Sequence, residues 1–145
     1  MAIDRQGTAL ALLRVAIGVF FVFESLLKIG WLGDPSILAG QFGAWSGSVP
    51  PGSTSAWYLQ TIAIPFASVF ARLVPIGEFV CGVALVAGFW TRLFAFIAFF
   101  MALNFQIASG AIFRYSFLTS GYGLPVLGST LALALGAVRL PFSLR

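Results

Sequence analysis

Six polar side chains interrupt the apolar stretches of this sequence, and their types and spacing could do chemistry: Glu24, Lys28, Arg72, Glu78, Asn104 and Gln106. An ionisable group near the centre of a bilayer costs about 2.5–3.5 kcal/mol, so each one needs a partner or a function. Glu24 and Lys28 are spaced i, i+4 with the acid first, which is the favourable order for an ion pair on a helix.

We expect these six residues to lie at one depth of a helical bundle, as the wall of a pocket that opens toward the outer face and holds the head of a small amphiphile. Glu78 is the candidate for proton exchange, and Lys28 and Arg72 are the candidates to stabilise a reduced, anionic head. The alternative is that the six residues pair off as hydrogen bonds and ion pairs between helices. Both arrangements are compatible, because a satisfied network can also form the wall of a pocket.

Two absences in the composition narrow the chemistry further. The sequence has no histidine, which excludes imidazole ligation of haem, a histidine metal site and a Ser-His or Cys-His nucleophile. Its one cysteine, Cys81, leaves neither an internal disulfide nor a dithiol pair, and we expect it to be a small apolar packing residue. We therefore expect no metal and no covalently bound cofactor.

The composition as a whole is that of an integral membrane protein with a single domain over residues 1–145. Hydrophobic residues make up 60% of the 145 residues and charged residues only 8%, against about 25% charged in soluble globular domains. Mean hydropathy is +1.02. The basic residues are scattered singly, which favours contact with lipid and gives no basic patch for nucleic acid.

Four apolar stretches predict an all-α, four-transmembrane-helix bundle with spans at about 8–31, 73–90, 93–113 and 122–140. Each approaches the roughly 20 residues that a helix needs to cross the bilayer core. Residues 34–72 are expected to form a loop and interfacial helices between the first two spans. Asp34 and Pro35 resemble an N-cap followed by proline at the first helical position, and Pro65 interrupts the later apolar stretch.

Single charges predict the orientation of the bundle. An even number of spans places both termini on one side, and that side carries four arginines: Arg5, Arg92, Arg139 and Arg145. The positive-inside rule therefore predicts cytoplasmic termini and places the six polar residues in the outer half of the membrane. Within the last span, Gly128, Ala132 and Gly136 form a small-residue stripe, which indicates close helix packing inside the bundle or against a partner.

Two stretches resemble the DoxX family of small bacterial membrane proteins. The first span has the family's L-R-x-x-x-G-x-x-F pattern, with Arg14, Gly18 and Phe21, followed by Lys28 about two turns later. The second stretch is similar to the family pattern E-x-x-x-G-x-x-L-x-x-G-x-x-T-R, with its fixed residues at Glu78, Gly82, Leu85, Gly88, Thr91 and Arg92. Glu24 departs from the small or polar residue that is usual there, and it adds a charge pair.

The resemblance implies a four-helix bundle in the bacterial cytoplasmic (inner) membrane, beside redox systems, because the family includes a membrane subunit of thiosulfate:quinone oxidoreductase. We therefore expect a subunit that contacts quinone, is not catalytic on its own and anchors a partner supplying the electrons. Two alternatives remain open. One is a non-catalytic structural or assembly subunit of a larger membrane complex, and the other is a small transporter or lipid-handling protein.

Overall fold

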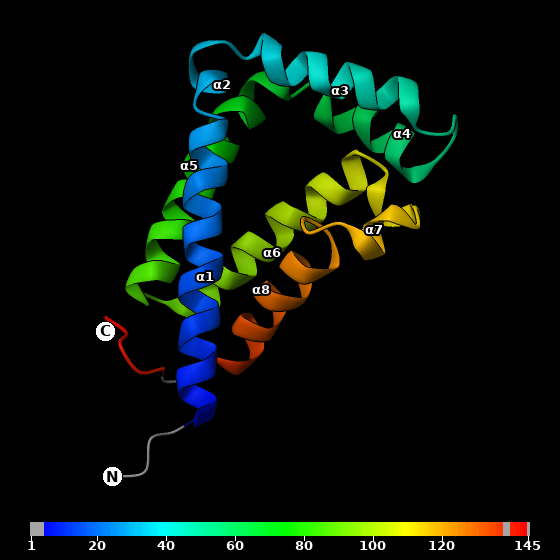
Figure 1. Cartoon of the computed structure of the whole chain (residues 1–145). Coiled ribbons are helices and arrows are strands. Elements are labelled where there is room, and N and C mark those ends of the chain that lie inside the picture. Colours follow the sequence, from blue (N-terminus) through cyan, green and yellow to red (C-terminus); the bar gives the residue numbers. More distant parts are fainter. Residues whose placement is uncertain (1–4, 138–139, 145) are drawn as a thin grey trace.

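The computed structural model describes residues 5–137 and 140–144, and within them the chain forms helices and turns without a strand (Figure 1). The all-α prediction is therefore confirmed for this part of the chain. The elements in chain order are α1 (Arg5–Leu27), α2 (Gly30–Gly33), α3 (Ser36–Ser48), α4 (Thr54–Tyr58), the π-helix η1 (Leu59–Ala63), α5 (Ala67–Ala87), α6 (Thr91–Ala108), the 3₁₀-helix η2 (Ala111–Phe113), α7 (Ser116–Thr119) and α8 (Leu124–Gly136).

Three of these helices, α1, α5 and α6, are long and apolar enough to cross a membrane. Their outward faces carry large apolar side chains that no other part of the described chain covers, such as Leu12, Phe23, Leu73 and Phe100. Such exposed apolar faces are unfavourable in water and favourable in lipid. The chain is therefore a membrane protein whose outer helix faces contact lipid.

The fourth predicted span is represented by a shorter helix. α8 has 13 residues, which at 1.5 Å per residue is about 20 Å, less than the roughly 30 Å of the bilayer core. Pro125 stands in the first turn of α8. At the other end of the helix, the Ala137 amide donates to the backbone carbonyl of Leu133. Residues 138 and 139 of the predicted span, including Arg139, lie outside the described residues, as does Arg145. A fourth crossing remains a prediction.

The long helices pack in two pairs, α1 along α5 and α6 along α8. Figure 1 shows α6 leaning away from α1 toward the end of the molecule that is remote from the termini. α5 and α6 are joined at the opposite end by a tight turn at Gly88, whose φ of 73° is in the left-handed region that glycine tolerates. The two pairs therefore meet at the terminal end and diverge at the other.

The region between α1 and α5 folds back over the divergent end. The side chain of Asp34 accepts the Ser36 amide at 3.0 Å, as expected of a residue that caps the start of a helix, and α3 runs on to Ser48. Leu38 and Phe42 of α3 pack into a buried core with residues of η1 and α5. In Figure 1, α3 crosses the ends of the long helices. Its position at a membrane surface remains a prediction.

α5 begins at Ala67, six residues before the predicted start of the second span. Pro65 lies in the preceding turn, where the Ile64 amide donates to Leu59 at 2.9 Å in the wider π-helical pattern. Pro75 lies inside α5 and does not end it, because a buried helix loses only one backbone hydrogen bond at a proline and packing offsets that loss. The predicted boundary was therefore too late.

Candidate functional site

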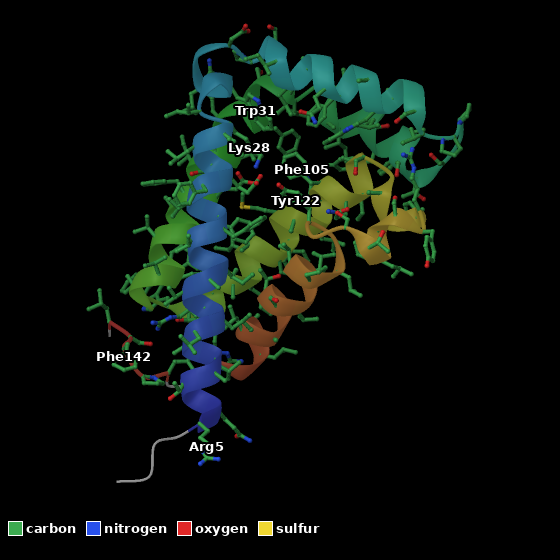
Figure 2. The ribbon with its side chains drawn as sticks, in the orientation of Figure 1. Arg5, Lys28, Trp31, Phe105, Tyr122 and Phe142 are labelled. Atoms are coloured by element: carbon green, nitrogen blue, oxygen red, sulfur yellow. The ribbon has the colours of Figure 1, made fainter. Side chains whose placement is uncertain are left out.

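Lys28 lies between two carboxylates at the end of α1 that is remote from the termini (Figure 2). Its Nζ is 2.8 Å from Glu24 Oε2, one turn back on the same chain segment. The same Nζ is 3.0 Å and 2.9 Å from the two carboxylate oxygens of Glu78 on α5. It also donates to the backbone carbonyl of Glu24 at 3.3 Å. We call these three residues the Lys28 cluster.

A close approach of the two helix backbones allows this cluster to form. A Cβ atom added to Gly18 would lie 2.7 Å from the backbone nitrogen of Val86, and one added to Gly82 would lie 2.7 Å from that of Val22. Gly82 is one turn beyond Glu78, so the same face of α5 carries both residues. The glycines of the two family patterns therefore bring Glu78 within hydrogen-bonding distance of Lys28.

The Lys28 cluster is largely removed from solvent and carries an excess negative charge. The exposed fractions of the Glu78, Lys28 and Glu24 side chains are 6%, 15% and 17%. Two carboxylates and one ammonium give a net formal charge of −1. The Lys28 ammonium also lies 6.0 Å from the ring centre of Trp31 and 5.9 Å from that of Phe105, within the range of cation–π attraction.

The Lys28 cluster forms one wall of a cavity of about 410 Å³ between the diverging helix pairs. Figure 2 shows Lys28, Trp31, Phe105 and Tyr122 gathered in this space. Its other walls are mainly aromatic and apolar. The lining residues are Phe20, Phe21, Glu24, Lys28, Trp31, Gln41, Trp45, Glu78, Ala102, Phe105, Gln106, Tyr122 and Val126. A charged group at one end of an apolar cavity suits an amphiphilic ligand with a compact polar head.

The structure brings four of the six sequence-predicted polar residues to this cavity and places two elsewhere. Gln106 lines it and donates to the backbone carbonyl of Tyr122 at 2.9 Å. Asn104 does not line it, and its side-chain oxygen accepts from the Tyr58 hydroxyl. Arg72 is exposed. It lies six residues before Glu78, about 120° around the helix, and so occupies a different face of α5.

Several wall residues were not among the candidates from the sequence. Trp31 and Trp45 are two of them, and both line the cavity. Trp45 reaches it because α3 folds back over the divergent end, where its ring packs edge-on against Phe105 at 6.1 Å between centres. The clustering of tryptophans in residues 31–57 was the available signal, but the direction of the fold-back has no sequence signature.

The remaining residues of the family patterns lie at the terminal end of the bundle. Arg14 is 1% exposed, and its Nη2 donates to the backbone carbonyl of Phe142 at 2.9 Å. Its Nη1 donates to Ser143 Oγ, so the arginine binds the C-terminal segment. A Cβ atom at Gly88 would lie only 2.0 Å from Arg14 Nη1. Position 88 therefore requires a glycine for two reasons: its φ is positive, and the Arg14 guanidinium fills the space that a side chain would need.

Thr91 and Arg92 stand in the first turn of α6 at the same end. Thr91 is buried, and Arg92 Nε donates to the backbone carbonyl of Ala134 on α8 at 3.1 Å. A wider cavity of about 810 Å³ lies here, lined by residues 88 and 90–93 and by the C-terminal segment. Since Arg92 bonds to α8 and Arg14 bonds to the C-terminal segment, both have structural partners.

The small-residue stripe of α8 faces away from the bundle. Gly128, Ala132 and Gly136 are all exposed, and a Cβ atom at Gly128 would meet nothing within 4 Å. At Gly136 the nearest atom to such a Cβ would be Leu10 Cδ1, at an ordinary 3.5 Å. The stripe was expected to pack either inside the bundle or against a partner. In the described chain it makes no tight packing contact inside the bundle.

Cys81 is a buried packing residue. Cys81 is 1% exposed and packs in an apolar core with Ile17 and Phe21. In the part of the chain that the structure describes, no group of three or more His, Cys, Asp or Glu side chains is arranged to hold a metal ion.

Comparison with known proteins gives one match. The sequence model of the DoxX family matches residues 9–110, which extend from the first turns of α1 to the end of α6 and include the whole Lys28 cluster. No curated protein matches the chain. No solved structure matches it either.

Proposed function

The chain belongs to the DoxX family, and from this premise we propose that it is a membrane subunit of a redox complex that binds a quinone and anchors the partner supplying the electrons. We place it in the bacterial cytoplasmic membrane with its termini inside. Arg5 and Arg92 support this orientation, because both stand at the terminal end of the bundle. The Lys28 cluster then lies in the outer half of the membrane.

The observation that carries the proposal is the junction of the Lys28 cluster with aromatic walls in one cavity. A quinone has a flat, polar ring on an apolar tail and supplies two-electron, two-proton redox chemistry when bound. Phe20, Phe105 and Tyr122 provide faces on which a flat ring can stack, with offset or tilted geometry favoured. The cavity volume of about 410 Å³ is within the range of small-molecule sites.

The geometry suggests different roles for the two glutamates. Both oxygens of Glu78 accept from Lys28, so this residue is the main counterion of the ammonium. Glu24 accepts from Lys28 through Oε2 alone, which leaves its second oxygen for a ligand head. We therefore propose Glu24 as the group that exchanges a proton with the ligand, with Glu78 as a positioning residue. Because Arg72 is exposed and outside the cavity lining, it has no part in this site.

Purification tests the subunit role. The protein is extracted from its native membranes in mild detergent, and co-purifying proteins and extracted quinones are quantified by mass spectrometry. We expect about one quinone per chain together with a redox partner in fixed ratio. A chain that purifies alone and without quinone contradicts the proposal.

The second candidate is a structural or assembly subunit, favoured by the exposed stripe of Gly128, Ala132 and Gly136 on α8. Small residues let another helix approach closely in a membrane, where interfaces are stabilised by packing. Bulky substitutions such as Gly128→Leu would then dissociate a larger complex while leaving the isolated chain folded. A complex that keeps its full composition in this variant excludes a packing role for the stripe.

A further inference from the structure

We propose that the polar end of the cavity selects a head that donates a hydrogen bond, a phenol or the reduced quinol, over the carbonyl-bearing oxidised form. This inference rests on the proposed function, because it concerns the same cavity, and it specifies the chemical form that the cavity binds. It reverses the expectation that Lys28 stabilises an anionic head. The argument depends on how the protons and charges of the Lys28 cluster are already used.

The ammonium of Lys28 has no free proton for a ligand. An ammonium has three N–H donors, and Nζ has four oxygen atoms of Glu24 and Glu78 within 3.3 Å. Lys28 is also the one cation among the residues that line the cavity. A ligand carbonyl or anionic oxygen could therefore reach the ammonium only by displacing a carboxylate that is already bonded to it.

A free acceptor remains on Glu24. Its Oε2 is bonded to Lys28, whereas its Oε1 forms no hydrogen bond with the rest of the described chain. The side chain lines the cavity and is only 17% exposed. A hydroxyl group of the ligand can donate to this oxygen, and a hydrogen bond to a carboxylate is roughly twice as strong as one between neutral groups.

The charge of the Lys28 cluster acts in the same direction. With two carboxylates and one ammonium the net charge is −1, and a ligand oxygen without a proton would place its lone pairs against that charge. Neutral donors in the wall, such as the indole of Trp31 and the hydroxyl of Tyr122, can serve a carbonyl and a hydroxyl oxygen alike. The carboxylate of Glu24 is therefore the group that discriminates between the two forms.

The test uses two redox-inert probes of nearly the same shape, 4-heptylphenol and 4-heptylanisole, which differ in whether the oxygen carries a proton or a methyl group. Their binding to the full chain in lipid nanodiscs is measured by equilibrium dialysis. Nanodiscs with Ala102→Trp, which fills the cavity from α6, give the background from partition into lipid. Anaerobic decylubiquinol and decylubiquinone form a second pair of probes.

We expect the phenol to bind at least about tenfold more tightly than the anisole, a difference of about 1.4 kcal/mol, and the quinol to exceed the quinone in the same direction. Glu24→Gln keeps an acceptor oxygen but removes the charge, and it should reduce the preference to about twofold or less.

Equal binding of both members of each pair above background overturns this inference and leaves the proposed function standing. A preference that survives in Glu24→Gln overturns the role of Glu24. If none of the four probes binds above background, the proposed function fails as well.

Discussion

Gly18 and Gly82 hold α1 and α5 in backbone contact, and each occupies the space that a side chain on the other would need. A Cβ atom on Gly18 would lie 2.8 Å from the Gly82 carbonyl oxygen, and one on Gly82 would lie 2.8 Å from the Gly18 carbonyl oxygen. Neither backbone atom can move aside without moving its helix. The contact therefore sets the distance between the helices that carry Lys28 and Glu78.

Replacing either glycine with alanine should destabilise the protein. For Gly18→Ala or Gly82→Ala we expect a loss of about 1–3 kcal/mol in the free energy of unfolding, as for other overpacked positions. The measurement is thermal or denaturant unfolding in detergent. Gly128→Ala is the matched control, because its Cβ would meet nothing within 4 Å. If all three variants unfold alike, the contact between the helices is not a close one.

Within the Lys28 cluster, removing the cation should destabilise the protein more than removing the charge of Glu24. Lys28→Met leaves two largely buried carboxylates without a counterion and should cost about 3–5 kcal/mol of stability. Glu24→Gln leaves the Lys28–Glu78 pair intact and neutral and should change stability by less than about 1 kcal/mol. Unfolding of the two variants under the same conditions gives the comparison. Equal losses would show that the net charge of −1 does not govern the stability of the cluster.

Arg14 should hold the C-terminal segment against the bundle. Arg14→Gln removes the donors to Phe142 and Ser143 and weakens the neighbouring bond from the Leu144 amide to the Ala87 carbonyl, 3.2 Å in length. We expect hydrogen exchange in residues 140–144 to become at least about tenfold faster by mass spectrometry. Arg72→Gln, at an exposed position, is the control and should leave this exchange unchanged. Equal exchange in both variants contradicts the role of Arg14.

The stability of the start of α3 should depend on pH through the ionisation of Asp34. The hydroxyl and then the amide of Ser36 donate to its carboxylate and hold its pKa below the ordinary value. A group with a lowered folded-state pKa stabilises the fold above its unfolded pKa, and this contribution is lost as pH falls through the folded pKa. Ser36→Ala removes the larger cause, so the Asp34 pKa should rise. A carboxyl-carbon NMR titration measures it, and an unchanged midpoint contradicts the assignment.

The three long helices were predictable because their apolar stretches match the thickness of a bilayer and few other structures tolerate such composition. The Glu24–Lys28 pair was predictable for a similar reason, since i, i+4 neighbours meet on any helix. The motif glycines could be located from the family pattern. Their reciprocal contact depends on how two helices are rotated about their axes, which a single sequence does not encode locally.

The sequence predicted which polar residues lie at a similar level along the helices, but it did not predict which face of its helix each residue occupies. Arg72 and Glu78 were expected to act together at one level, yet they lie on different faces of α5. Asn104 was expected beside Gln106, but it bonds to Tyr58. Trp45 entered the cavity wall through tertiary folding of α3. α8 begins at Leu124, two residues after the predicted start of the last span, and ends at Gly136.

Binding to the cavity is the most direct test of the proposed function. The full chain in nanodiscs is titrated under anaerobic conditions with decylubiquinol, the form that the cavity is proposed to prefer, and the bound amount per chain is compared for wild type, Ala102→Trp and Ala132→Trp. Ala102 lines the cavity, whereas Ala132 is exposed on α8 and serves as a control of equal bulk. We predict saturable binding of about one molecule per chain in wild type and Ala132→Trp, with loss in Ala102→Trp. Binding that is absent in wild type, or unchanged when the cavity is filled, would contradict a quinone site beside Lys28.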